Sequence, residues 1–486
     1  MRPFRSVIPL SSAAAPFAGL LVLMHFLAFC GSTTLQAQDP TPIRTAIVAG
    51  PAGFELEWNA SGEGEAYTVQ VRDWLTGRPW LPAPLDRPWP IDATRVTLPL
   101  GTELGSQFYR VLAVPPTERG KLLSTSSLGS LSTLQVNFLL QLAGIPVAAQ
   151  YGVEVLKIGY ETIDPWGGRT LATGVLAVPQ GAPGPLPIVS YQHGTVMATN
   201  DVPSADLAQR IPGIGFASQG YAAVLPDFLG LGDSPGFHPY HHARSEATAA
   251  VDLLRAARAW CATAGVALGA ELFLCGYSQG GHATMALHRE LEAYHPDEFT
   301  VTASAPMAGA HDLSGITLDD FLSGRELPNP YYVAYLLAAY QEVYDLLDAW
   351  SDWLQSPYDE DLPPLLAARA SGGDINRAMP SDITQLLHPE TLAALLIDPE
   401  HPLRRALRDN DVYQWLPRAP IRMLHCQADA DVPYLNSVKA RDTMLALGAT
   451  AVEWVDPQPT ASHGECILPA FLATLDWFES LRHSGP

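Results

Sequence analysis

The chain has 486 residues, of which 47% are hydrophobic and 16% charged, so it is too long for one small domain and too apolar for a disordered chain. Fifty acidic side chains against 28 basic ones give a net charge of −22, which excludes a nucleic-acid-binding surface. Five cysteines without a Cys-x-x-Cys pair indicate neither a disulfide scaffold nor a zinc site.

The first 37 residues have the pattern of an export signal. Arg2 and Arg5 precede an apolar run over residues 17–30, which is shorter than the roughly 20 residues of a membrane-spanning helix. This pattern predicts a signal peptide over residues 1–37 and a secreted or periplasmic mature protein, whose net charge would be −24 without the two arginines. The alternative is a lipoprotein anchored at Cys30, because the residues before this cysteine resemble a bacterial lipobox, although a phenylalanine stands where a small residue is expected.

Residues 41–114 read as a small β domain. Apolar and polar side chains alternate along four short segments, as half-buried antiparallel strands require; these are residues 54–58, 67–71, 94–98 and 108–111. Their spacing resembles a fibronectin type III sandwich. No set of catalytic residues occurs in this region, so it is interpreted as a packing module, with docking or carbohydrate contact as the alternative.

A serine-rich and proline-bounded segment over residues 115–134 predicts a linker, after which a catalytic domain over 135–486 is expected. Residues 153–160 and 170–178 predict a hairpin. Six apolar runs then alternate with helical patterns; they cover residues 187–192, 221–226, 271–276, 301–305, 421–425 and 451–455. This alternation predicts an α/β fold with a doubly wound, mostly parallel sheet.

Strand signals stop between residues 312 and 413. Within this stretch, residues 331–354 are rich in leucine, alanine, tyrosine and tryptophan at helical spacing. A helical insertion of this size between two strands of a sheet predicts a cap over a site.

A nucleophile is predicted at Ser278. The run Gly276–Gly280 is Gly-Tyr-Ser-Gln-Gly, and it lies between an apolar strand and a helical segment. In that context Gly-x-Ser-x-Gly is typical of a nucleophile elbow, in which the serine occupies a strained turn at the carboxyl edge of the sheet.

A serine nucleophile needs a histidine base that is oriented by a carboxylate. In the chain order serine, acid, histidine, we expect Asp429 as the acid, with Asp431 as its competitor, and His463 as the base on a loop before the last helix. Packing or solvent-facing roles suffice for the other histidines near these motifs, which are His241, His242, His282 and His425.

The reaction would place negative charge on a substrate oxygen, so two preorganised donors are expected. The backbone N–H of Gln279 follows the nucleophile, and the second donor is assigned to the N–H of Thr195, with Gly194 as the alternative. Of the four cysteines beyond the signal peptide, Cys426 and Cys466 are favoured as a disulfide because both lie near loops that must meet; buried free thiols are the alternative.

Several ordered motifs together resemble the secretory lipase family of α/β-hydrolases, which includes yeast lipase A-type enzymes and bacterial relatives. They are residues 191–195, 226–236, 238–240 (His-Pro-Tyr), 276–281, 426–433 and 463–464, within a similarity that covers residues 151–482. The resemblance implies carboxylic ester hydrolysis, a helical cap and acyl-chain binding beneath it. Cys426 replaces a glycine that is frequent in the family, and the N-terminal β domain lies outside the family core. Residues 227–236 are expected to shape a loop at the sheet edge, with support of the oxyanion loop by Asp227 and Asp233 as the alternative.

The sequence therefore predicts a secreted serine carboxylic ester hydrolase that forms an acyl-enzyme and requires no metal or organic cofactor. Its substrate would be a small-molecule or lipid ester, and the cap would allow contact with a lipid interface. The alternatives are a serine peptidase or acyltransferase with the same residues, or a non-catalytic secreted binding protein. No oligomeric state follows from these residues.

Overall fold

The computed structural model describes residues 43, 45–50, 53–60, 66–72, 79–85, 87–98 and 108–482. The predicted signal peptide over residues 1–37 and the lipidation alternative at Cys30 lie outside this part of the chain. Among the described residues, no helix combines the length and the apolar character needed to cross a membrane.

Two small antiparallel sheets form the N-terminal part. One contains β1 (Thr45–Gly50), β2 (Gly53–Trp58) and β5 (Arg95–Leu98), and the other contains β4 (Leu81–Pro82), β3 (Ala66–Arg72) and β6 (Phe108–Val114). The inward side chains of the alternating patterns, among them Trp58, Val69 and Val96, form a common core. The four predicted strands are thus present and agree with a separate β domain, while the likeness to a fibronectin type III sandwich stays a prediction.

A nine-stranded sheet follows, with the strand order β15-β14-β13-β12-β10-β11-β9-β8-β7. Neighbours from β11 to β15 are parallel, whereas β9, β8 and β7 pair antiparallel at one edge. The bounds are β7 (Leu122–Leu131), β8 (Gly152–Ile163), β9 (Arg169–Gln180), β10 (Leu186–Gln192), β11 (Ala222–Pro226), β12 (Leu268–Tyr277), β13 (Ala303–Met307), β14 (Ile421–Leu424) and β15 (Val452–Val455). Each predicted apolar run therefore forms a strand of one sheet.

The predicted linker over residues 115–134 is wrong for most of its length. Residues 122–131 form β7, which pairs with β8 as the edge strand of the large sheet, and α1 (Thr133–Leu142) begins directly afterwards. Most side chains of β7 are exposed or half-buried. A serine-rich edge strand that faces solvent lacks the apolar pattern of a buried strand, so its composition resembles that of a linker.

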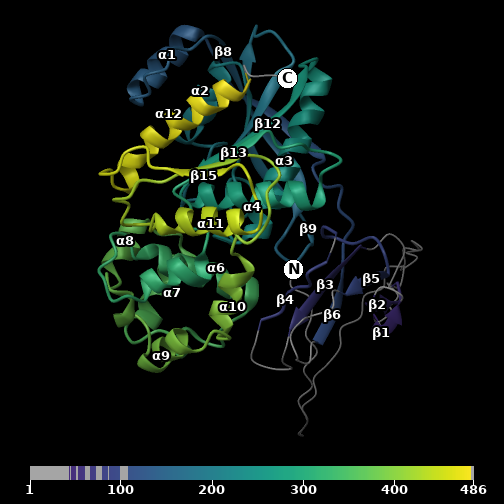
Figure 1. The fold of residues 1–486 in the computed structure, drawn as a ribbon, viewed down its shortest axis with the longest axis vertical. Coiled ribbons are helices and arrows are strands. Elements are labelled where there is room, and N and C mark those ends of the chain that lie inside the picture. Colours follow the sequence, from purple (N-terminus) through teal and green to yellow (C-terminus); the bar gives the residue numbers. More distant parts are fainter. Residues whose placement is uncertain are drawn as a thin grey trace, which may run out of the picture. The chain divides into compact units, whose positions relative to one another are not determined.

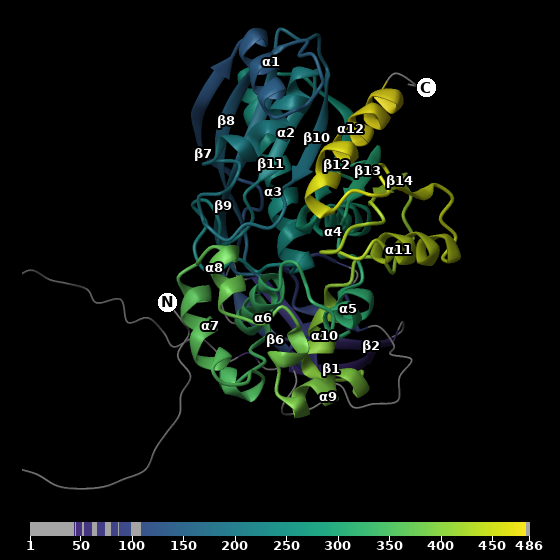
Figure 2. The same ribbon diagram turned by 90° about the vertical axis from the view of Figure 1, so that its left-hand side faces the viewer.

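Helices cover both faces of the sheet (Figures 1 and 2). On one face, α1, α2 (Leu207–Ser218) and α12 (His463–Arg482) bury aromatic and aliphatic side chains such as Phe216 and Phe478. On the other, α3 (Ala243–Ala264), α4 (Gln279–Tyr294) and α11 (Leu435–Ala446) pack against the strands. This three-layer arrangement leaves the carboxyl ends of the parallel strands at one edge, where loops meet.

The predicted cap is a helical insertion between β13 and β14, drawn in green in Figure 1. It has an apolar core of its own, made largely of leucine and tyrosine side chains. Its helices are α5 (Leu318–Phe321), α6 (Tyr331–Tyr344), α7 (Tyr358–Ala367), α8 (Gly372–Arg377), α9 (Pro389–Ile397) and α10 (Pro402–Asp409), with a π-helical turn over Leu313–Thr317 and 3₁₀ turns over Trp350–Asp352 and Ile383–Gln385. The helix expected over 331–354 ends earlier, because Asp345 caps α6 in a left-handed conformation with φ of 53°.

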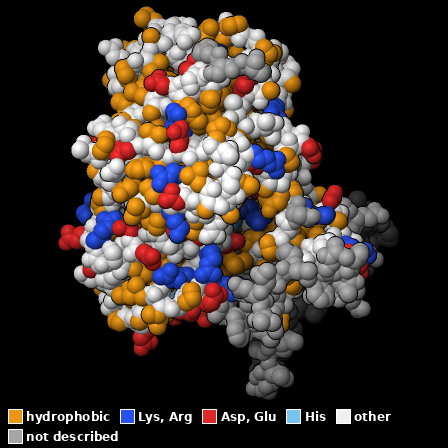
Figure 3. All heavy atoms as spheres, in the orientation of Figure 1, with side chains coloured by type: hydrophobic (Ala, Val, Ile, Leu, Met, Phe, Trp, Pro, Cys, Tyr) orange, Lys and Arg blue, Asp and Glu red, His pale blue; other side chains and the backbone are white. Residues whose placement is uncertain are grey.

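Acidic and basic side chains are intermixed on the face shown in Figure 3. Apolar atoms lie between them. Among the coloured residues of this view, neither the acidic nor the basic side chains form one large patch.

Candidate active site

Ser278 occupies a sharp turn between β12 and α4. Its backbone angles are φ 60° and ψ −119°, a strained region that non-glycine residues rarely adopt. The flanking glycines are required by close packing: a Cβ atom at Gly280 would lie 2.0 Å from the backbone oxygen of Gln192, and one at Gly276 would lie 2.5 Å from the same oxygen. The predicted elbow geometry is present.

The structure brings the three predicted residues together from separate elements. The Nε2 atom of His463 lies 2.9 Å from the Oγ atom of Ser278, and its Nδ1 atom lies 2.6 Å from Oδ2 of Asp429. Asp429 sits on the loop after β14, as expected, whereas His463 is the first residue of α12 rather than a residue of the preceding loop. One imidazole therefore connects a hydroxyl group to a carboxylate.

Asp429 is stabilised as a carboxylate. Burial alone would raise its pKa, but hydrogen bonds and electrostatic interactions with His425 and His463 outweigh burial and lower the pKa below its ordinary value. Its Oδ1 atom accepts the backbone N–H groups of Asp431 and Val432 at 3.0 and 2.9 Å. The residue is therefore ionised and rigidly oriented towards the imidazole.

Asp431, the competing acid, faces elsewhere. Its Oδ1 atom accepts a hydrogen bond of 2.8 Å from the side-chain amide of Asn329, which belongs to the cap. The two-residue offset turns its carboxylate away from His463, so the geometry favours Asp429.

Two supporting contacts are not predicted by the sequence. His425, for which a packing role was expected, is fully buried with its Nε2 atom 3.3 Å from Oδ2 of Asp429 and 3.0 Å from the carbonyl oxygen of Val432. The hydroxyl of Tyr277 donates a 2.6 Å hydrogen bond to the carbonyl oxygen of His463. The position of His425, four residues before Asp429 at the end of a strand, is the only sequence signal for this support.

The residues predicted as oxyanion donors flank Ser278. Gln279 is the first residue of α4, where a helix leaves backbone N–H groups without intrahelical partners. Thr195 follows β10, and a Cβ atom placed on the adjacent Gly194 would lie 3.8 Å from Cβ of Ser278. Both segments therefore run next to the nucleophile.

Asp227 and Asp233 touch this region only indirectly. The carbonyl oxygen of Asp227 lies 3.2 Å from Nε2 of His193, while its carboxylate accepts hydrogen bonds from Thr173 and the N–H of Ser204. Asp233 pairs with a lysine on β8 at 2.8 Å. The expected loop at the sheet edge is present, and its contact with the oxyanion loop is made by the Asp227 backbone.

A disulfide joins the loop that carries the acid to the first turn of α12, which carries the base. Cys426 and Cys466 are bonded, three residues before Asp429 and three residues after His463. This is the pairing that the sequence favoured; Cys261 and Cys275 are buried free thiols.

One further polar cluster lies behind the elbow. His241, Glu246 and His282 place their ligand-type atoms within 4.8 Å of one another, a spacing seen in metal sites. The Nδ1 atom of His282 is only 2.7 Å from Oε2 of Glu246, however, and its Nε2 atom lies 2.9 Å from the carbonyl oxygen of Asn410. The first distance is that of a direct hydrogen bond and leaves no room for an ion between these two atoms.

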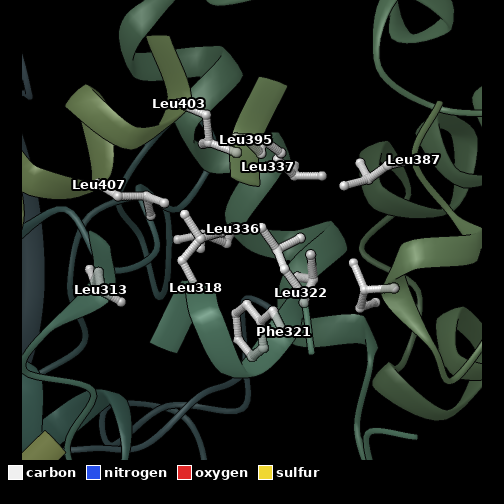
Figure 4. Close-up of a pocket in the computed structure, with 12 residues that line it drawn as sticks. Leu313, Leu318, Phe321, Leu322, Leu336, Leu337, Leu387, Leu395, Leu403 and Leu407 are labelled. Carbon is white, nitrogen blue, oxygen red and sulfur yellow. The ribbon is translucent and has the colours of Figure 1, made fainter. Parts of the chain in front are cut away.

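An apolar space extends from Ser278 into the cap. The pocket at the nucleophile is lined by Tyr240, His241, Ser278, Gln279, Ala310, Leu313, Thr317, Phe321, Tyr332, Leu336, Asp431 and Val432. A second, wholly apolar pocket shares Leu313, Phe321 and Leu336 with it, and Figure 4 shows its leucine side chains converging from several cap helices. The cavity volumes are about 30 and 20 Å³.

The comparisons with known proteins agree with this geometry. Residues 214–317 match the family model described as secretory lipase. The solved structure of the rice cell wall degrading esterase LipA from Xanthomonas oryzae is 30% identical with a TM-score of 0.67, covering 74% of this chain and 96% of that chain. A putative hydrolase from Legionella pneumophila is 25% identical with a TM-score of 0.71, covering 75% of this chain and 99% of its own.

Lipase A from Candida antarctica, in its closed state, is 18% identical with a TM-score of 0.60, covering 76% of this chain and 84% of that chain, and shows the fold alone. No curated protein sequence matches the chain. The predicted α/β-hydrolase fold is confirmed by these neighbours, and the family match and the esterase neighbour support a hydrolase that acts on carboxylic esters. The chain belongs to the secretory lipase family.

Proposed function

We propose that this protein is an exported serine ester hydrolase in which Ser278, His463 and Asp429 form the catalytic triad. The observation that carries the proposal is the imidazole of His463, hydrogen-bonded at 2.9 Å to the serine hydroxyl and at 2.6 Å to the buried carboxylate. A serine hydroxyl becomes nucleophilic near neutral pH only beside such a base.

The mechanism follows from this arrangement. His463 takes the proton of Ser278 as Oγ attacks the ester carbonyl, and Asp429 stabilises the imidazolium that forms. The backbone N–H groups of Gln279 and Thr195 hold the oxyanion of the tetrahedral intermediate. His463 then protonates the leaving alcohol, and water attacks the acyl-enzyme by the same route to release the acid.

The acyl group of the substrate is assigned to the apolar pockets of the cap. Their lining carries no charged side chain except that of Asp431, which suits a hydrocarbon chain. Both cavities are small, about 20 and 30 Å³, so a long hydrocarbon chain would require cap side chains to move apart. Contact of the cap with a lipid interface would favour that movement.

Export would leave a mature chain that starts after residue 37 and contains two parts. The first is the β domain over residues 41–114, and the second is the catalytic domain, whose sheet begins at Leu122. Membership of the secretory lipase family supports an extracellular or periplasmic location. Mass determination of the N-terminus after expression with export tests the cleavage position and the lipidation alternative at Cys30.

Substitution of the nucleophile tests the proposed chemistry. Ser278→Ala should abolish turnover of a chromogenic acyl ester, by a factor of about 10⁴ or more, with an unchanged circular dichroism spectrum. The matched control is Ser218→Ala, which removes a buried hydroxyl that donates to Gly215 on α2 and should leave turnover intact. A fluorophosphonate probe should label the wild type and the control but not Ser278→Ala, and retained turnover in Ser278→Ala would refute the proposal.

A further inference from the structure

The His-Pro-Tyr segment over residues 238–240 contacts the side chains of both proposed oxyanion donors. Nε2 of His238 lies 2.7 Å from Nε2 of Gln279, and the hydroxyl of Tyr240 lies 2.9 Å from Oγ1 of Thr195. His238, Tyr240 and Gln279 are all more than nine-tenths buried. One short segment therefore touches α4 and the loop after β10, which are distant in the sequence.

His238 has the protonation state that its contact with Gln279 requires. Its Nδ1–H group donates to the carbonyl oxygen of Leu229 at 2.8 Å, and burial lowers its pKa to about 4, so the ring is neutral near pH 7. Nε2 therefore presents a lone pair to the amide of Gln279, whose second N–H donates to Oε1 of Glu246 at 2.9 Å. Both side-chain amide hydrogens of Gln279 therefore donate hydrogen bonds, one to His238 and one to Glu246.

Tyr240 is held as firmly on the other side. Its ring stacks on that of Tyr335 in cap helix α6, with centroids 4.6 Å apart and planes inclined by 13°. The hydroxyl of Tyr335 donates to the carbonyl oxygen of Val196, next to Thr195, at 3.2 Å. The loop that carries Thr195 is consequently tied to both the His-Pro-Tyr segment and the cap.

We propose that His238 and Tyr240 are positioning residues that keep the N–H groups of Gln279 and Thr195 converged on one point. Two donors on separate elements stabilise an oxyanion only if their separation and direction are set before the reaction. The intervening proline restricts the backbone between the two side chains, so the segment acts as a short rigid brace. This inference rests on the proposed function, since it assigns a purpose to residues around the same nucleophile.

Tyr240→Phe tests the brace at the Thr195 end, because it removes the hydroxyl but keeps the ring on Tyr335. Turnover number should fall about tenfold while KM changes less than about twofold, since loosening a donor costs less than the 10²- to 10³-fold loss seen when one is removed. Affinity for a trifluoromethyl ketone, whose adduct with the serine mimics the oxyanion, should fall by the same factor. The matched control is Tyr160→Phe, which removes a buried hydroxyl bonded to the carbonyl oxygen of Ala249 and should change neither quantity.

Substitutions of His238 test the Gln279 end. His238→Leu removes the acceptor and should lower both turnover number and ketone affinity, whereas His238→Gln retains an oxygen near the position of Nε2 and should restore most of both. A purely structural role predicts a lower melting temperature with an unchanged ratio of ketone affinity to substrate KM. If His238→Leu does not fold, Tyr240→Phe decides alone.

The outcomes separate this inference from the proposed function. If Tyr240→Phe keeps wild-type turnover and ketone affinity while Ser278→Ala is inactive, the brace is refuted and the triad stands. If Ser278→Ala itself remains active, both proposals fail.

Discussion

The surroundings of Asp429 illustrate how single residues define this site. One oxygen of its carboxylate contacts His463 and His425, and the other accepts two backbone N–H groups. Asp431, only two residues away, contacts the cap instead. The difference between these two carboxylates is therefore one of orientation, and it leads to a direct test.

Asp429→Asn should reduce turnover far more than Asp431→Asn. An asparagine cannot stabilise the imidazolium of His463 and can hold the ring in the wrong tautomer, so a loss of about 10³- to 10⁴-fold is expected. Asp431→Asn keeps a hydrogen-bonding group opposite Asn329 and should cost less than about tenfold. Steady-state kinetics with one soluble ester measures both, and comparable losses would contradict the assignment.

At this scale the sequence predicts residues whose motifs are local and misses those that act through distant contacts. Ser278, Asp429 and His463 are predictable because the elbow motif and the chain order serine, acid, histidine are visible in the sequence. Tyr277 is hydrogen-bonded to His463, which lies 186 residues further along the chain, and no local sequence pattern predicts that bond. His425 likewise looked like an ordinary residue at the end of a strand, because its role depends on how the following loop folds back.

Among the elements, the disulfide ties the loop after β14 to the first turn of α12. Cys426→Ser combined with Cys466→Ser should lower the free energy of unfolding by about 4 kcal/mol, the chain-entropy expectation for a closed loop of 40 residues. Turnover should also fall, because Asp429 and His463 sit on the two joined segments. Urea denaturation and kinetics measure the two effects.

The reductant provides the internal control for this disulfide. Because both sulfur atoms of this disulfide are buried, the wild type is first reduced with dithiothreitol in urea and then refolded in its presence. This treatment should reproduce both losses and have no further effect on the double variant, since the remaining thiols Cys261 and Cys275 are unpaired. Full activity of the double variant would show that the two segments hold their positions without the bond.

The two ends of the cap are joined by a hydrogen-bonded carboxyl group. Asp411, just after α10, accepts bonds from the N–H and hydroxyl groups of Ser314 at 3.0 and 2.6 Å. Burial raises the pKa of Asp411 to about 6 in spite of these bonds. Because the native pKa exceeds the unfolded value, this group favours folding at acidic pH, and that contribution is lost as the pH rises through about 6.

Asp411→Asn should therefore stabilise the protein selectively at higher pH. The expected gain in the free energy of unfolding is up to about 3 kcal/mol near pH 7.5 and close to zero near pH 4, where the aspartate is already neutral. Urea denaturation at the two pH values gives the comparison. An equal effect at both would show that the substitution acts through its hydrogen bonds rather than through titration.

Most elements were predictable because buried strands are continuous apolar runs, and the large sheet contains all of those expected. β7 is not predictable in this way, because its serine-rich sequence lacks an apolar pattern. It forms a strand only through its pairing with β8 at the edge of the sheet. The start of α12 was placed too late for a related reason. His463 belongs to the helix while it serves the site, and a functional residue at a helix end looks like a loop residue in the sequence.

Across the whole molecule, the β domain contacts the catalytic domain through Trp89. The guanidinium of Arg244 on α3 lies 4.4 Å from the Trp89 ring, and Arg119 donates to the Trp89 carbonyl oxygen at 3.3 Å while pairing with buried Asp252. Ile163 at the end of β8 belongs to the apolar core of the β domain. Such continuous packing predicts that the two parts unfold together.

Trp89→Ala should therefore destabilise the entire chain and not the β domain alone. The loss of a buried tryptophan costs about 3–5 kcal/mol, and the side chain is 3% exposed. Calorimetry should show one transition in the wild type and one at a lower temperature in the variant, with esterase activity lost over the same interval. If calorimetry instead shows two transitions, and the substitution lowers the temperature of only the one with the smaller enthalpy, the two domains are energetically independent.

The junction between Ser314 and Asp411 also bears on how this enzyme could change over evolution. β13 and β14 are adjacent in the sheet, so an insertion that leaves one and returns to the other starts and finishes at almost the same place. Insertions of other lengths can therefore begin and end there without displacing these two strands. A replacement cap would have to keep the contacts of Asn329 with Asp431 and of Tyr335 with Tyr240, so chimeric enzymes joined at this boundary should retain those two cap residues.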